Sequence, residues 1–120
     1  MPAADPSPSR AFDVEWARQI LAEAMRRMSV ECERSGRNDL WGVFQERIVL
    51  PATEGAEPIA YEALISRYGF ESPAQASNSM ITAKRMFARH LRGVVAEYLD
   101  DPAEIDEELR ELRRIASASH

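Results

Sequence analysis

Between residues 73 and 98, polar side chains recur every three or four residues, as they do along one face of an α-helix. Amide and hydroxyl groups come first and guanidinium groups last, in the order Gln75, Asn78, Thr82, Arg85, Arg89 and Arg92. Amides and hydroxyls can read the edges of bases, and guanidinium groups bind phosphates. Lys84 adds a further positive charge, and no acidic residue lies between Pro73 and Arg92. These seven residues, called the polar stripe below, have the chemistry needed to contact a nucleic acid.

The other side of the same segment is apolar. Its residues are spaced three or four apart and comprise Ala76, Met80, Ala83, Phe87, Leu91, Val94 and Tyr98. This spacing predicts a helix that packs on a core with one face and turns the polar stripe outward. The alternative is an ordinary solvated surface, because most arginines on the outer face of a helix contact only water.

A shorter helix is expected just before this segment. Tyr61, Leu64, Ile65 and Tyr68 follow the spacing of an amphipathic helix. Gly69 stands where a helix ends in a left-handed conformation. Ser72 offers a side-chain cap for the next helix, whose first position would be taken by Pro73. The sequence therefore predicts a helix-turn-helix at residues 60–98.

The remaining segments of the N-terminal part also read as helices. Residues 1–11 are rich in proline and indicate a disordered leader, followed by a helical domain over residues 12–99. A first long helix is expected over residues 12–35, with Asp13 as its cap. A second, over residues 40–50, would be capped by Asn38 or Asp39 and ended by Pro51. A loop would then lead to residue 60.

Residues 100–120 predict an acidic C-terminal helix with a frayed end. Asp101 and Pro102 form a helix start, and Ile105, Leu109 and Leu112 form a narrow apolar seam. The seam could pack on the domain or dock onto a partner. The segment from Glu97 to Arg114 contains eight acidic and three basic residues, so it contributes a charge of −5, which equals the net charge of the whole chain. The polar stripe is therefore basic although the protein is acidic.

Length and composition indicate one all-α domain of four to five helices, with tails, in a 120-residue chain. The only cysteine, Cys32, fits a reducing cytoplasm and a small core position. No segment reads as a membrane span or a signal peptide. Two histidines without zinc-ligand spacing and no phosphate-binding glycine loop predict neither an enzyme nor a metal or cofactor site.

The order of four sequence blocks resembles that of the C-terminal part of bacterial extracytoplasmic-function sigma factors, in particular planctomycete-type members with a region 4 helix-turn-helix. The blocks are FDVEWARQILAEAMRRM, LWGVFQERI, IAYEALISRYGFESPAQASNSMITAKRMFARHLRGVVAEYL and PAEIDEELREL, within residues 12–112. The resemblance implies that residues Gln75 through Arg92 face the promoter −35 element. It also implies that the preceding helices hold the flap of the RNA polymerase β subunit. Without the region that melts the −10 element, a complete initiation factor is not expected.

Two functions remain open at this point. The first is a DNA-binding, transcription-related module whose partners are double-stranded DNA and RNA polymerase or a regulatory protein. The second is a non-enzymatic adaptor that uses the same helices to bind another protein. Self-association through exposed faces of the first long helix is a third possibility, and the sequence does not indicate the oligomeric state.

Overall fold

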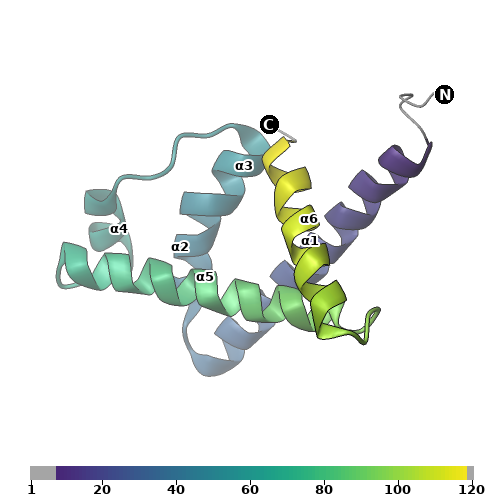
Figure 1. The fold of residues 1–120 in the computed structure, drawn as a ribbon. Coiled ribbons are helices and arrows are strands. Elements are labelled where there is room, and N and C mark those ends of the chain that lie inside the picture. The colour runs from purple at the N-terminus through teal and green to yellow at the C-terminus, as the bar shows by residue number, and fades with distance from the viewer. Residues whose placement is uncertain (1–7, 119–120) are drawn as a thin grey trace.

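We describe a computed structural model that covers residues 8–118, with the side chains of residues 14–114 (Figure 1). These residues form an all-α fold without a strand, which confirms the predicted fold class. Helix α5 crosses the front of the molecule, α2 and α4 lie over its first half, and α6 rises from its far end. The elements are α1 (Pro8–Ser35), α2 (Asn38–Phe44), the π-helical segment η1 (Gln45–Val49), α3 (Leu50–Glu54), α4 (Tyr61–Tyr68), α5 (Pro73–Val95) and α6 (Pro102–Ala118).

Helix α1 starts earlier than the sequence predicted. It begins at Pro8, so residues 8–11 of the expected leader are helical, and residues 1–7 lie outside the described range. Asp13 is inside the helix and not at its cap. The buried face has the expected period and consists of Ala17, Ile20, Ala24, Met28 and Cys32. This face packs on α5 and α6.

The next helical stretch contradicts two predictions. Arg37, and not Asn38 or Asp39, is the residue before α2, and the Asp39 carboxylate accepts hydrogen bonds from the Arg37 guanidinium at 3.0 Å. The helix also continues past Pro51 to Glu54. Because η1 interrupts the α-helical register, Pro51 falls in the first turn of α3, where a missing N–H costs little.

Helices α4 and α5 and the turn between them follow the sequence closely. Gly69 ends α4 with a φ of 72°, a left-handed conformation that suits glycine. The Ser72 hydroxyl accepts a hydrogen bond from the backbone N–H of Gln75 at 3.1 Å, and Pro73 is the first residue of α5. Helix α5 ends at Val95, so Tyr98 lies in the following turn. Tyr98 is 64% exposed, and its predicted place in the core is wrong.

Two apolar clusters anchor α5 along its length. The first joins α1, α2, α4 and the first half of α5 around Met28, Leu40 and Leu64. The second joins the start of α1, the end of α5 and α6 around Ile20 and Val94. Phe87 packs against both clusters and links them. Helix α5 is therefore held firmly by one face while the other faces solvent.

Helix α6 packs back on the domain. The Asp101 carboxylate accepts a hydrogen bond from the backbone N–H of Ala103 at 3.0 Å, as expected of a cap. Ile105 and Leu112 are buried in the second cluster, and Leu109 packs against it. The seam thus belongs to the core and is not available to a partner, so a charged residue placed there would test folding and not docking.

Candidate nucleic-acid interface

All seven residues of the polar stripe are exposed on α5; six of them lie three or four residues apart on one side, and Lys84 lies at the flank of that side. The opposite side is buried at Ala76, Met80 and Ala83. This division follows from the period of the sequence, because residues three or four apart share one helix face. The structure therefore places the predicted site residues together on one accessible surface.

The polar stripe differs along its length in how its side chains are engaged. Asn78, Thr82, Lys84 and Arg85 make no side-chain hydrogen bond or ion pair with any part of the chain that the structure describes. All four side chains are exposed to solvent. These four residues are called the open set below, and they are the part of the stripe that a ligand can contact without breaking an existing interaction.

Gln75 is tied to the turn before α5. Its side-chain oxygen accepts a hydrogen bond from the backbone N–H of Glu71, and its own backbone N–H is capped by Ser72. The amide of Gln75 therefore serves the start of the helix and contributes less to an open surface than the amide of Asn78 does.

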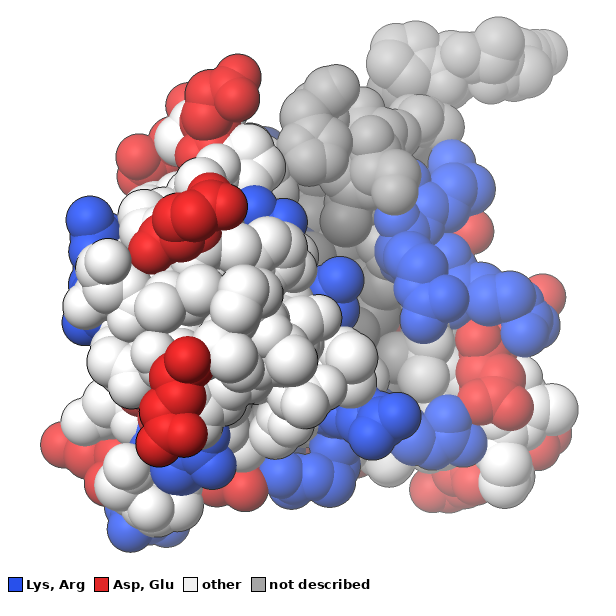
Figure 2. All heavy atoms as spheres, turned by 90° about the vertical axis from the view of Figure 1, so that its left-hand side faces the viewer, with Lys and Arg blue, Asp and Glu red and all other residues white. Residues whose placement is uncertain are grey.

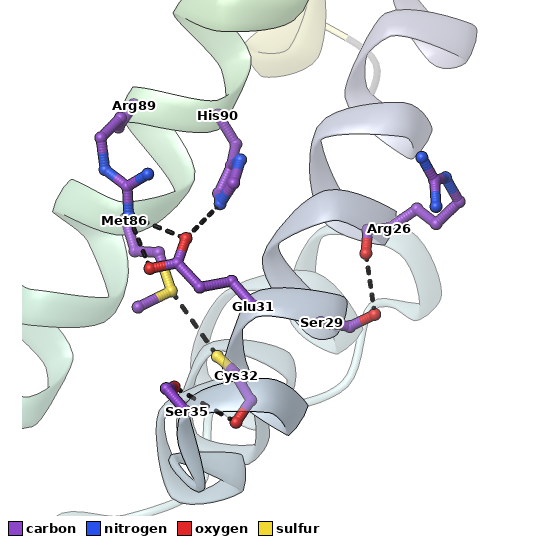
Figure 3. A network of polar contacts seen from close by, with 8 residues as sticks. All are labelled: Arg26, Ser29, Glu31, Cys32, Ser35, Met86, Arg89 and His90. Carbon is purple, nitrogen blue, oxygen red and sulfur yellow. Dashed lines mark hydrogen bonds and ion pairs between the residues drawn. The ribbon is translucent and has the colours of Figure 1, made fainter.

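Arg89 is engaged by an acid of α1. Its guanidinium donates to both carboxylate oxygens of Glu31 at 2.9 Å, and the ring of His90 contacts the same carboxylate at 2.6 Å (Figure 3). Charge-assisted hydrogen bonds from Arg89 first, and then from His90, lower the pKa of Glu31. Below this group, the thiol of Cys32 meets the sulfur of Met86 at 3.6 Å, so α1 and α5 are joined by polar and sulfur contacts.

Arg92 is engaged in the same way by α6. Its guanidinium donates to the Asp106 carboxylate at 2.6 Å and lowers the pKa of that group. Two of the guanidinium groups in the polar stripe are thus neutralised by the protein's own acids. Sequence reasoning could not find these pairs, because Glu31 lies 58 residues from Arg89 and the pairing depends on how the helices pack.

One residue of the exposed face is absent from the predicted stripe. Ile81 is 45% exposed, which is unusual for a large apolar side chain on a helix with a well-formed buried face. It lies three residues after Asn78 and four before Arg85, so all three side chains share one side of α5. Spacing alone could have placed Ile81 there, since it is out of phase with the apolar face.

The end of the molecule that carries α4 and the start of α5 has few charges. Figure 2 looks onto this end, which is mostly white, while basic side chains gather along its lower edge and at the right. The sequence of α5 agrees, because its first charged residue is Lys84. The neutral first half and the basic second half of the helix are therefore separate surfaces.

A hollow of about 670 Å³ lies between α1 and α5, beside Glu31. Its lining is mainly basic and consists of Arg26, Arg27, Val30, Glu31, Arg34, Ser35 and His90. Arg26 and Arg27 are held by Glu23, whereas Arg34 makes no ion pair with a described residue.

Among residues 8–118 the structure contains no group of three side chains suited to bind a metal. No described helix is long and apolar enough to cross a bilayer.

Comparisons with known proteins add no relative. No protein-family model, no curated protein and no solved structure matches this chain. The resemblance to sigma factor region 4 therefore stays a prediction from the sequence, and the functional argument depends on the surface of α5.

Proposed function

We propose that this protein binds double-stranded DNA through the exposed face of α5, as a transcription-related module similar to region 4 of sigma factors. The open set supports this proposal most directly. It presents the Asn78 amide, the Thr82 hydroxyl and the Arg85 guanidinium on one side of a helix whose other side is anchored in the core, and Lys84 adds an exposed positive charge at the flank of that helix. The major groove is about 12 Å wide and accepts an α-helix.

The four open side chains divide by chemistry. Asn78 and Thr82 lie nearer the N-terminus of α5, the part of a recognition helix that reads base edges. Lys84 and Arg85 follow within the next turn and bind backbone phosphates. With only two unengaged cations in the polar stripe and a net charge of −5, we expect weak binding that declines as salt rises.

The proposal is tested by fluorescence anisotropy with labelled duplexes of random sequence at low salt. Arg85→Glu should weaken binding to all sequences alike and reduce the salt slope by about 1. Arg18→Glu makes the same charge change on α1, far along that helix from the Glu31–Arg89 contact, and should bind like the wild type. A folded wild-type protein that binds no duplex at low salt would contradict the proposal.

A module of this kind would act in the cytoplasm, next to RNA polymerase. The resemblance assigns the polymerase contact to the helices before α5. Co-purification with core RNA polymerase tests this part separately, because it does not require the DNA surface. The complex should survive Arg85→Glu and be lost only when residues outside the polar stripe are changed.

The second function, a protein-binding adaptor, is favoured by two observations. Arg89 and Arg92 are already neutralised by Glu31 and Asp106, and the end of the molecule around α4 has few charges (Figure 2). Such an adaptor would bind its partner through that end. A partner complex that is insensitive to Arg85→Glu, together with no DNA binding, would establish the adaptor over the DNA-binding module.

A further inference from the structure

The strongest feature that the proposed function leaves unused is Ile81. It is 45% exposed although the other large apolar residues of α5 are buried or half-buried. The residues around it on the same face are small or polar, namely Ala74, Ser77, Asn78 and Ala88, and all are exposed. Small neighbours leave the side chain of Ile81 projecting from the helix surface, where a flat partner can reach it.

In a DNA complex, an apolar side chain at this place has one specific ligand. The major groove presents hydrogen-bonding groups from all four bases, but its apolar feature is the 5-methyl group of thymine. Lys84 and Arg85 stand three and four residues after Ile81 and would hold the phosphates at the groove's edge. Ile81 would then point toward the base pairs.

The spacing to Asn78 limits which base pair Ile81 can reach. Side chains three residues apart on a helix stand about 5–6 Å from each other. Base pairs are stacked about 3.4 Å apart, so the two residues would reach the same base pair or base pairs one or two steps apart. An asparagine amide pairs best with adenine, through its N6 and N7 groups.

From this geometry, and on the basis of the proposed function, we propose that Ile81 is a specificity residue that contacts a thymine methyl group. The preferred duplex then contains a thymine within two base pairs of the adenine read by Asn78. Ile81 thus adds a preference for thymine at one position, which the polar residues alone would not define.

The experiment separates the methyl group from every other property of thymine. The wild type is first used to select tight duplexes from a random pool at low salt. The best duplex is then remade with deoxyuridine in place of each thymine in turn, which removes only the 5-methyl group. Replacement of thymine by deoxyuridine at one position should lower the affinity of the wild type about fourfold, the value expected for one buried methyl group.

Variants identify the side chain that makes the contact. Ile81→Ala should bind the thymine and deoxyuridine duplexes equally, whereas Ile81→Leu should keep the difference. Thr82→Ser is the matched control, because Thr82 carries the other methyl group that could meet thymine, and it should keep the difference too. Since Ile81 is exposed, these variants should unfold at the temperature of the wild type, which circular dichroism checks.

The outcomes distinguish the inference from the function on which it rests. Selected duplexes that bind equally well with deoxyuridine at every position would overturn the role of Ile81 and leave DNA binding intact. A difference that disappears in Thr82→Ser and persists in Ile81→Ala would assign the contact to Thr82 instead. If no duplex is selected by the folded protein, both proposals are wrong.

Discussion

At the scale of single residues, the addition of a Cβ atom has opposite consequences for stability at two helical glycines, Gly42 and Gly93. A Cβ atom added to Gly42 would lie 2.7 Å from two ring carbons of Tyr68, and one added to Gly93 would meet no atom within 4 Å. The Tyr68 ring is fixed by a hydrogen bond from its hydroxyl to the Glu46 carboxylate at 2.7 Å. Burial first, and then this hydrogen bond, raise the pKa of Tyr68 to about 12. The ring therefore cannot move aside without losing a partner.

We accordingly predict opposite changes in stability for Gly42→Ala and Gly93→Ala. Gly93→Ala should raise the free energy of unfolding by up to about 1 kcal/mol, the difference in helix propensity. Gly42→Ala should lower it by about 1–3 kcal/mol, because the new methyl group overlaps the Tyr68 ring. Urea denaturation measures both. A stabilised Gly42→Ala would show that Tyr68 does not occupy the place described here.

At the scale of elements, helix starts are determined locally and can be tested locally. Ser72→Ala removes the cap of α5 and leaves the backbone N–H of Gln75 without its partner. We expect a loss of about 1 kcal/mol in the free energy of unfolding. Ser77→Ala is the same chemical change inside the exposed face of α5, where the better helix propensity of alanine should stabilise the protein slightly. Equal effects of the two changes would contradict a capping role for Ser72.

Whether a helix end depends on nearby residues explains which elements could be predicted from the sequence. The ends at Gly69 and the starts at Ser72 and Asp101 depend on residues within one turn, so their chemistry is readable along the chain. The passage through Pro51 depends on η1, a change of hydrogen-bond register that no residue type in the segment demands. The start of α1 at Pro8 lies inside the proline-rich segment that the sequence predicted to be a disordered leader.

For the candidate site, the sequence predicted the exposed face of α5, but not which of its side chains are engaged in ion pairs. The outward position of Asn78 and Arg85 follows from helical period alone. The engagement of Arg89 by Glu31 and of Arg92 by Asp106 follows from the packing of α1 and α6 against α5, which is tertiary information. Ile81 is out of phase with the apolar face of α5, so its outward position also follows from helical period, although it belongs to neither predicted stripe.

At the scale of the whole molecule, ion pairs within α1 and between α1 and the turn after α5 make stability depend on pH. Hydrogen bonds from Arg26 and then from Arg27 lower the pKa of Glu23 from 4.5 to about 2, and Arg27 also binds Glu97 at 2.8 Å, which joins α1 to the turn after α5. Because the Glu23 pKa is lower in the folded state than in the unfolded state, the interactions of its carboxylate stabilise the folded state in full above the unfolded pKa of 4.5. This contribution is lost as pH falls toward 2.

We therefore predict that the free energy of unfolding decreases as the pH falls below 4.5, the unfolded value of the Glu23 pKa. Glu23→Gln should weaken this decrease, because its neutral side chain cannot gain a proton. Glu62→Gln changes an exposed glutamate that makes no described ion pair and should follow the wild type. Urea midpoints measured from neutral pH down to about pH 2 test this. Parallel curves for wild type and Glu23→Gln would exclude the Glu23 contribution.

The distribution of charge over the whole molecule also bears on DNA affinity. Glu31 and Asp106 hold guanidinium groups that could otherwise bind phosphates, so a duplex must compete with the protein's own carboxylates. Glu31→Gln and Asp106→Asn remove one competing charge each and should raise affinity, each with a salt slope steeper by about 1. Both variants should remain folded, because the Asp106 pair is solvent-exposed and the Glu31 side chain is 35% exposed.

The control for this prediction is Glu57→Gln, which changes the net charge of the protein by the same amount in the loop between α3 and α4. Its glutamate contacts no residue of the polar stripe, so its effect measures long-range charge alone. Anisotropy titrations over a series of salt concentrations compare the three variants. If Glu31→Gln and Asp106→Asn bind no better than Glu57→Gln, Arg89 and Arg92 do not reach the phosphates, and the DNA surface is confined to the open set.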